Sequence, residues 1–345
     1  MVQTMVWSIF TSSVVSLLWF WFIRNSSWSH YFQDVPNKRS SHTKIASRGA
    51  GYIFCLAIGF PIVFMGIQAG RGLAFKAFII ASAFVGLGSI GLIDDIYNVS
   101  AKLRLLFHLI SAFLVVLIVT SAKSIVDWPI LMAATTFIAL TINFYNFADG
   151  INGFVATQFL ITSAGWLSHF CLTGIGKDFF HNPEYVAPLV VCLTAFLWFN
   201  VVKKTVFMGD SGSTVLGLLV GSFHVLGPDF SFLSWIKSAA LASIFSFVIF
   251  ADCSTMIIAK TLLGINWTTP HRQHFYQRLS RRSGWSHIRA SVALAILQFI
   301  INGVCLLVIQ ANQMSYWILF LVILIFLILF TFFTNKRSLK QAHCL

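Results

Sequence analysis

The chain has 345 residues, of which 58% are hydrophobic and only 10% are charged, and its mean hydropathy is +0.84. A soluble domain is about 45–50% apolar and about 25% charged, so this composition excludes a soluble enzyme, a disordered protein and a disulfide scaffold. The chain carries 23 Lys and Arg against 10 Asp and Glu, a formal net charge of +13. In a membrane protein the meaning of such an excess depends on where along the chain it lies.

Runs of about 20 mainly apolar residues are long enough to cross a bilayer as helices. The runs here are continuously apolar and do not alternate, which favours helices over a barrel. The sequence therefore predicts an all-α polytopic membrane protein, with residues 1–345 forming a single membrane domain. About eleven transmembrane helices are expected, near residues 4–23, 50–68, 74–92, 105–121, 126–147, 154–173, 186–202, 212–226, 238–259, 288–309 and 315–334.

The basic residues are distributed unevenly between the two sides of this arrangement. The connections after odd-numbered runs, together with the C-terminal tail, hold 18 of the 23 Lys and Arg residues. By the positive-inside rule, the N-terminus is periplasmic and the C-terminus is cytoplasmic. The positive charge is then a signal of topology with some attraction to anionic membrane lipids, and no nucleic-acid partner is expected.

Two adjacent acids, Asp94 and Asp95, end the third run, and Lys102 follows at the start of the fourth. Neighbouring carboxylates repel, so such a pair persists where a cation or a nearby basic side chain compensates. A solvated pair in a loop is the alternative interpretation.

Amide and carboxyl side chains close the fifth run. Asn143, Asn146 and Asp149 are spaced three apart, which places their oxygens on one face of a helix. Carboxylate and amide oxygens are the ligands that Mg²⁺ prefers, although an Asn-Asp-Gly segment is also ordinary turn chemistry.

Asp210 opens the eighth run, between Gly209 and Gly212. An Asp at a helix start is a common cap. The same helix N-terminus would also suit a phosphate or a metal-bound anion.

Two inner connections are basic. The longest contains His271, Arg272 and His274, and the first contains Arg39 and His42. A basic amphipathic helix on the membrane surface is one interpretation, and a clamp on phosphate groups is the other.

These groups lie in five cytoplasmic connections, near residues 34–51, 93–104, 143–153, 203–213 and 260–287. Phosphoryl transfer needs a metal ion, basic groups for the developing charge and a base for the nucleophile. A site at the membrane face suits a lipid substrate. Asp252, inside the ninth run, is the one acid that lies deeper, and we expect either a site-entrance or a structural role for it.

These motifs together resemble the bacterial polyprenyl-phosphate N-acetylhexosamine-1-phosphate transferases, the group that includes MraY and WecA. The resemblance runs from about Asp34 to Arg289 and covers five motifs in the family's order. They are Pro36 to His42, the Asp94-Asp95 pair with Lys102, Asn143 to Gly150, Phe207 to Ser213, and the loop with His271 and His274.

The resemblance implies that a UDP-linked N-acetylhexosamine gives its sugar-1-phosphate to undecaprenyl phosphate, leaving UMP. It implies Mg²⁺, which Mn²⁺ could replace, and a site on the cytoplasmic face of the bacterial inner membrane; a homodimer is also compatible. Asp210, and less directly Asp149, would hold the metal, while Asp94 or Asp95 would act on the lipid phosphate. The resemblance also implies that Lys102 lies near the phosphates and that Phe207 contacts the uracil. It implies that Asn143, Asn146 and Asp149 hold the nucleotide. The other substrate-binding residues that it implies are Asn152, His271, Arg272, His274, Arg39 and His42.

Departures from the family pattern bear on the substrate. Asn152 stands where the family usually has a second Asp, and His274-Phe-Tyr-Gln replaces the His-x-His-His pattern of WecA. These details resemble the WbpL-like branch that initiates O-antigen synthesis, which implies a 6-deoxy sugar such as FucNAc or QuiNAc, with GlcNAc and GalNAc as alternatives. A phospho-N-acetylmuramoyl-pentapeptide transferase and, from a different class, a transporter or flippase are the competing predictions.

Overall fold

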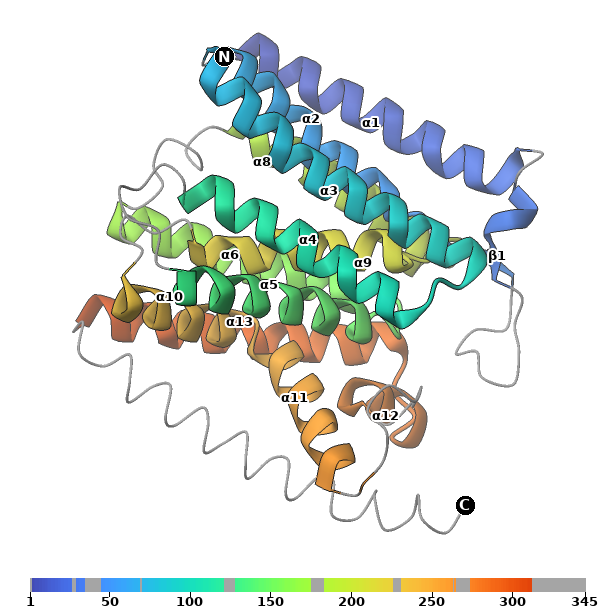
Figure 1. Ribbon diagram of the computed structural model, residues 1–345. Coiled ribbons are helices and arrows are strands. Elements are labelled where there is room, and N and C mark those ends of the chain that lie inside the picture. Colours follow the sequence, from blue (N-terminus) through green and yellow to red (C-terminus); the bar gives the residue numbers. More distant parts are fainter. Residues whose placement is uncertain are drawn as a thin grey trace.

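In the computed structural model, the described residues are 2–26, 29–34, 45–68, 70–120, 128–174, 183–225, 231–262, 264 and 274–311. They form helices almost throughout, as predicted (Figure 1). The one described sheet is a short antiparallel pair, in which β1 (Gln33–Asp34) lies beside β2 (Ala46–Ser47). The N-terminal part of the chain also contains α1 (Val2–Asn25), η1 (Ser29–Phe32), α2 (Tyr52–Gln68), α3 (Arg71–Tyr97) and α4 (Ala101–Thr120).

The second half of the chain continues the helical bundle. Its helices are α5 (Trp128–Ala148), α6 (Phe154–Thr173), α8 (Pro183–Leu197), the π-helix η2 (Trp198–Val202), α9 (Asp210–Ser222), η3 (Phe223–Val225), α10 (Phe232–Phe245), α11 (Phe247–Leu262), α12 (Phe275–Arg282) and α13 (His287–Ala311). Among the described residues, α3, α4, α5 and α13 are each long and apolar enough to cross a membrane. The protein is therefore an all-α, multi-pass membrane protein. The total of eleven spans and the orientation of the termini stay predictions, and the run 315–334 lies outside the described residues.

The span expected near 238–259 is bent within its length, and whether this pair of helices crosses the membrane stays a prediction. The chain breaks at Ser246, where α10 and α11 are bent by 94°, and α11 leaves the bundle at a steep angle (Figure 1). A break at membrane depth frees backbone groups that lipid cannot satisfy. Gln298 of α13 satisfies two of them, because it accepts from the N–H of Val248 at 2.8 Å and donates to the carbonyl of Ile244 at 3.0 Å.

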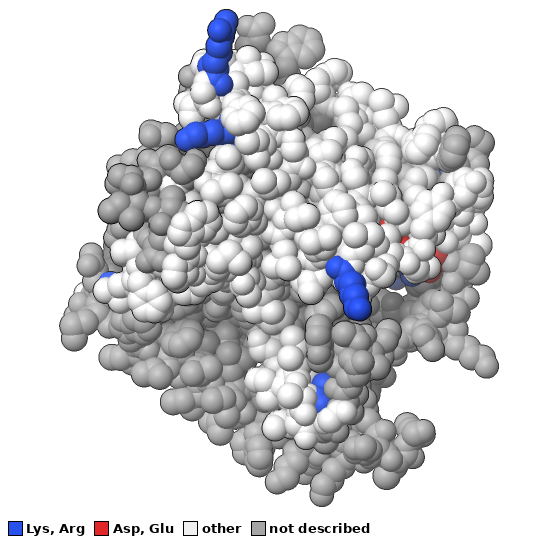
Figure 2. Space-filling view, viewed as in Figure 1, with Lys and Arg blue, Asp and Glu red and all other residues white. Residues whose placement is uncertain are grey.

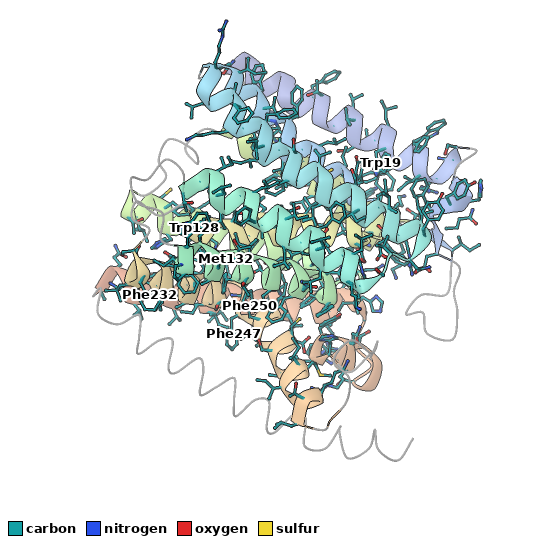
Figure 3. The ribbon with its side chains drawn as sticks, viewed as in Figure 1. Trp19, Trp128, Met132, Phe232, Phe247 and Phe250 are labelled. Carbon is teal, nitrogen blue, oxygen red and sulfur yellow. The ribbon has the colours of Figure 1, made fainter. Side chains whose placement is uncertain are left out.

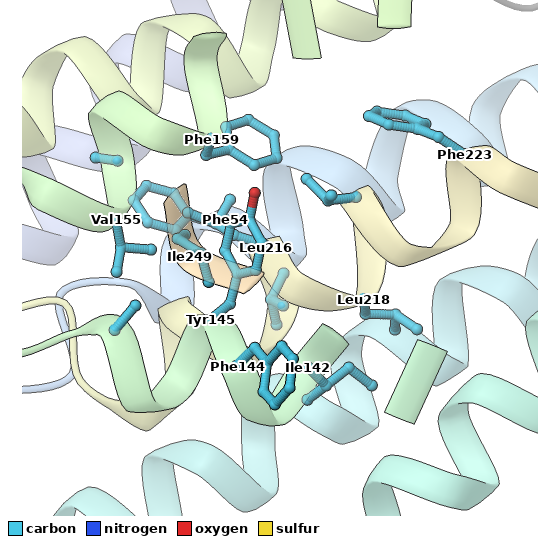
Figure 4. Close-up of a cluster of buried hydrophobic side chains, with 14 of the residues drawn as sticks. Phe54, Ile142, Phe144, Tyr145, Val155, Phe159, Leu216, Leu218, Phe223 and Ile249 are labelled. Atoms are coloured by element: carbon cyan, nitrogen blue, oxygen red, sulfur yellow. The ribbon is translucent and has the colours of Figure 1, made fainter. Parts of the chain in front are cut away.

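Helix α9 is the centre of the bundle, in contact with α2, α3, α4, α5 and α6. All of its residues except Asp210 and Leu219 are buried. Figure 4 shows part of the surrounding core, to which α5 contributes Tyr145, α6 contributes Phe159 and α9 contributes Leu216. Because apolar helices enclose it on every side, this short helix holds its first residue, Asp210, in a fixed place.

The two ends of the bundle differ in chemistry. In the view of Figure 2 most of the surface carries no charge, and the visible acidic side chains gather at the end where β1 lies. At the opposite end, Trp128 and Phe232 are exposed by 61% and 63% (Figure 3). Exposed aromatic residues at the end of a bundle are typical of a membrane interface. The acidic side chains at the other end are the candidates for a catalytic site.

Candidate active site

A tight turn between α3 and α4 brings the end of one helix beside the start of the next. Asn98 ends α3 in the left-handed conformation, with φ 55°, and its N–H bonds to the carbonyl of Asp94. Asn tolerates this conformation better than most residues, which suits it to a helix C-terminus. Ser100 then caps α4 by accepting from the N–H of Leu103 at 3.4 Å, and the first turn of α4 therefore faces Asp94.

A second connection places the start of α9 at the same end. The segment before α9 runs beside β2, where Phe207 donates its N–H to the carbonyl of Ser47 at 2.8 Å. Behind it, glycines let the helices touch. A Cβ added at Gly51 would lie 2.3 Å from the Cα of Gly212, and one at Gly91 would lie 2.6 Å from the backbone N of Ser211. Any side chain at these two glycines would push α9 out of place.

Asp95 caps the N-terminus of α9 from outside that helix. Its Oδ1 accepts from the N–H of Asp210 at 2.9 Å, and its Oδ2 accepts from the N–H of Ser211 at 3.3 Å. A carboxylate at this position also interacts favourably with the helix dipole. Gly209 is required beside it, since its φ is 73° and an added Cβ would lie 2.3 Å from Asp95 Oδ2.

Arg104 joins the other two carboxylates of the site. One of its nitrogens, Nη1, lies 3.0 Å from Asp94 Oδ2 and 2.9 Å from Asp210 Oδ2. The sequence predicts Lys102 near the phosphates, but Lys102 is exposed and forms no ion pair among the described residues. Two basic residues that are two apart point in different directions on a helix, and only the packing of α4 decides which one faces the site.

Asn146 and Asp149 also face α9, as their spacing predicts. Asn146 donates to the hydroxyl of Ser213 at 3.3 Å, and the N–H of Gly209 donates to the carboxylate of Asp149. Burial, followed by the charge of Asp210, raises the pKa of Asp149 from 3.8 to about 7, while the Gly209 N–H and Arg48 act in the opposite direction. Burial therefore favours the protonated form of Asp149 in the folded protein at pH values below about 7.

The hydrogen bonds of the other two amides of this segment go to groups other than the carboxylates. Asn143 donates to the carbonyl of Ala139, one turn earlier in its own helix, at 2.7 Å. Asn152 donates to the carbonyl of Asn200 at 2.8 Å, and its own carbonyl accepts from Ser291 at 3.0 Å. Asn152 thus connects η2 with α13. Asn200, buried in η2, was missed by sequence reasoning because a single Asn in an apolar run gives no signal.

The remaining predicted residues lie around this centre or outside the described chain. Phe207 is partly buried beside β2. His274 is buried and donates from Nδ1 to Asp252 Oδ2 at 3.2 Å. Arg39, His42, His271 and Arg272 fall outside the described residues.

The oxygen donors of the site fit a divalent cation. Asp94 Oδ2 and Asp210 Oδ2 converge on one point, which a positively charged nitrogen of Arg104 now holds. Within the described ranges, no three His, Cys, Asp or Glu side chains are close enough to bind a metal by themselves. Two carboxylates with substrate and water oxygens are a typical coordination sphere for Mg²⁺.

Comparison with known proteins gives a consistent result. Residues 77–227 match the model of glycosyl transferase family 4. The chain is 30% identical to the decaprenyl-phosphate N-acetylglucosaminephosphotransferase of Mycobacterium tuberculosis, over 74% of this chain and 70% of the relative. It is 24% identical to the probable undecaprenyl-phosphate N-acetylglucosaminyl 1-phosphate transferase of Bacillus subtilis, over 84% of this chain and 81% of the relative.

A relative from peptidoglycan synthesis is also similar. The chain is 24% identical to the phospho-N-acetylmuramoyl-pentapeptide-transferase of Deinococcus radiodurans, over 83% of this chain and 89% of the relative. These matches confirm the predicted family, whereas the WbpL-like branch stays a prediction. Because the chain is 30% identical to a relative of this kind over 70% of that relative's length, and residues 77–227 match the family model, the chain belongs to glycosyl transferase family 4, the polyprenyl-phosphate N-acetylhexosamine-1-phosphate transferases.

Proposed function

We propose that the protein transfers N-acetylhexosamine-1-phosphate from a UDP-sugar to undecaprenyl phosphate, giving a polyprenyl-diphospho-sugar and UMP. The observation that carries this proposal is the meeting of Asp94 and Asp210 on one cationic nitrogen. It combines carboxylates, a cation and a capped helix N-terminus at one end of an apolar bundle. A charged donor and a lipid acceptor could both reach such a position.

The two adjacent carboxylates have different roles in this reaction. Both oxygens of Asp95 accept backbone N–H groups, so Asp95 holds α9 in place. Asp94, whose Oδ2 lies beside Arg104 at the point shared with Asp210, would be the base that takes a proton from the lipid phosphate. A phosphate oxygen of the lipid attacks the sugar-bearing phosphorus of the donor, the bond from that phosphorus to the UMP oxygen breaks, and UMP leaves. Arg104 stabilises the charge that develops on the phosphate oxygens.

Asp210, and less directly Asp149, would hold Mg²⁺, and the ion would neutralise the diphosphate oxygens. Asn146 and Asp149 lie beside the same helix start and would hold the nucleotide. Phe207, partly buried next to this position, would offer a ring for the uracil.

The sugar is a 6-deoxy N-acetylhexosamine such as FucNAc or QuiNAc, and the reaction is the first membrane step of O-antigen synthesis. The protein crosses the bacterial inner membrane about eleven times with its N-terminus outside, and it presents the acidic end to the cytoplasm. The clustering of acids at one end (Figure 2) and the basic inner connections support this orientation.

Exchange of labelled UMP into a UDP-sugar tests this function. Membranes with the protein and undecaprenyl phosphate would be offered UDP-GlcNAc, UDP-GalNAc, UDP-QuiNAc, UDP-FucNAc and UDP-MurNAc-pentapeptide in turn. Mg²⁺-dependent exchange with a 6-deoxy sugar supports the proposal. Exchange with the muramoyl donor alone would move the protein to peptidoglycan synthesis, and no exchange with any donor would overturn the enzyme class.

The same assay without undecaprenyl phosphate distinguishes two schemes. Direct attack by the lipid phosphate requires the lipid for any exchange. Exchange that persists without lipid would mean that an Asp attacks first and carries the phospho-sugar, as in a double displacement.

A further inference from the structure

Arg48, in the segment that follows β2, is a second basic residue close to the carboxylates of the site. Its Nη2 lies 3.0 Å from Oδ1 of Asp34 in β1. Burial raises the pKa of Asp149, and the positive charge of Arg48 acts on the same carboxyl in the opposite direction. The guanidinium therefore lies within electrostatic range of both acids. Arg104 alone serves as the basic group of the proposed reaction, and Arg48 has no role in it so far.

The backbone around Arg48 is fixed to the segment that leads into α9. The N–H of Arg48 donates to the carbonyl of Phe32 at 2.7 Å. Two residues later, Ala50 donates its N–H to the carbonyl of Phe207 at 3.2 Å. Phe207 lies three residues before Asp210 in the sequence. Arg48 and the start of α9 are thus held by the same set of backbone hydrogen bonds.

The two partners of the ion pair differ in exposure. The Asp34 side chain is 13% exposed, whereas the Arg48 side chain is 43% exposed. A guanidinium has five N–H donors, so a bond to one carboxylate leaves donors on the exposed side for a ligand. An ion pair with an exposed partner adds little to stability. Its clearest effect here is that Asp34 orients the guanidinium.

The substrates of the proposed reaction add negative charge to a site whose carboxylates already occupy Arg104. One nitrogen of Arg104 contacts both Asp94 and Asp210. The donor diphosphate and the lipid phosphate both bring further charged oxygens. A guanidinium binds such oxygens through two parallel N–H bonds, which a single ammonium group cannot do. Arg48 offers this group on the side of the site where Asp149 lies.

We propose that Arg48 binds the diphosphate of the nucleotide-sugar donor, and that Asp34 positions its guanidinium for this contact. The inference rests on the proposed function, in which Asp149 helps to hold the nucleotide. Arg48 acts on Asp149, whereas Arg104 lies beside Asp94, the proposed base for the lipid phosphate. The two arginines therefore serve different substrates.

Binding of UDP to the purified protein tests this contact without turnover, because UDP carries the diphosphate but no sugar to transfer. We expect Arg48→Gln to raise the Kd for UDP about 10- to 100-fold, as for one charge-assisted hydrogen bond. Arg48→Lys keeps the charge without the planar group and should lose less. Lys203→Gln is the matched control. It removes a positive charge from an exposed side chain that lies 5.7 Å from the ring of Trp198, and we expect no change in Kd.

Steady-state kinetics identifies the substrate that Arg48 binds. We expect Arg48→Gln to raise the KM for the UDP-sugar by a similar factor and to leave the KM for undecaprenyl phosphate within about twofold of the wild type. A wild-type Kd for UDP in Arg48→Gln would overturn the proposal. A rise in the lipid KM alone would assign Arg48 to the lipid phosphate and would refute the contact with the donor.

A double variant separates positioning by Asp34 from a merely structural ion pair. Asp34→Asn removes the charge that orients Arg48, and we expect the Kd for UDP to rise about threefold. Added to Arg48→Gln, it should raise the Kd no further. If the pair only joined β1 to β2, Asp34→Asn would lower the melting temperature of the ligand-free protein without changing the Kd, and the positioning role would be refuted.

The binding assay also distinguishes this inference from the proposed function. Weaker UDP binding by Arg48→Gln in a protein that transfers no sugar from any donor would refute the proposed function alone. Transfer with wild-type UDP binding in Arg48→Gln would refute the inference and leave the proposed function intact.

Discussion

Asp95 and Asp210 lie on different helices, and the side chain of the first caps the backbone of the second. The bond from the N–H of Asp210 to Asp95 Oδ1 is 2.9 Å long. One acid of the adjacent pair therefore organises the helix whose first residue is the acid opposite. This leaves Asp94 and Asp210 free to interact with a cation.

Replacement of this cap is expected to affect folding and activity together. Asp95→Ala removes both acceptors, so we expect the free energy of unfolding to fall by about 1–2 kcal/mol. Transfer should fall with it, because Asp210 moves. Asp95→Asn keeps one acceptor and should lose less. Thermal unfolding in detergent and the exchange assay measure the two effects, and an Asp95→Ala protein with wild-type melting and turnover would show that the cap is dispensable.

The two basic residues at the start of α4 are expected to behave differently. Arg104→Ala leaves Asp94 and Asp210 facing each other without their shared cation, and we predict a loss of about 100-fold or more in kcat/KM. Lys102→Ala changes an exposed side chain and should cost much less. Steady-state kinetics on both variants gives the comparison. Equal losses would mean that Lys102 reaches the phosphates in the working enzyme.

Removal of the metal ion should stop the reaction, because Asp210 is the proposed metal ligand. We expect chelation by EDTA to abolish UMP formation and added Mg²⁺ to restore it. Asp210→Asn should lower kcat by about 100-fold or more, since a charged oxygen ligand is lost. Asp34→Asn, in the ion pair with Arg48 at 3.0 Å, is the control carboxylate and should keep its Mg²⁺ response. Full turnover by Asp210→Asn would exclude it as the metal ligand.

Asp149 should make the metal-free protein less stable as the pH rises. Its folded pKa is raised from 3.8 to about 7, so the folded state favours the protonated form. The stability that it contributes is complete below about pH 4 and is lost as the pH rises through about 7. In EDTA we expect the melting temperature to fall over this range in the wild type and to fall less in Asp149→Asn. Parallel curves for the two proteins would contradict the assignment.

The sequence predicts the helices better than their bends. The run 154–173 coincides with α6 (Phe154–Thr173), because apolar residues between turn signals define a span locally. The break at Ser246 has no such signal, since the surrounding run contains neither Pro nor Gly. The groups that stabilise it belong to Gln298, which is distant in the sequence.

For the site, the sequence predicts which residues share a helix face but does not predict which side chains meet across helices. The spacing of Asn146 and Asp149 predicts that they share one helix face, and in the structure both lie against the start of α9. The choice of Arg104 over Lys102 depends on the rotation of α4 in the bundle, and the pairing of Asp252 with His274 depends on the angle of α11. These are tertiary facts that residue spacing does not contain.

The close approach at Gly51 and Gly91 has a consequence for how this enzyme can change. Each glycine lies directly against the first turn of α9, so the place of Asp210 is decided by positions that have no side chain. In a library of random variants screened for altered sugar preference, we expect active variants with many different substitutions at residues that contact the substrate. We expect almost no active variants with substitutions at these two glycines. The positions that tolerate the fewest substitutions would then be two glycines that take no part in the chemistry.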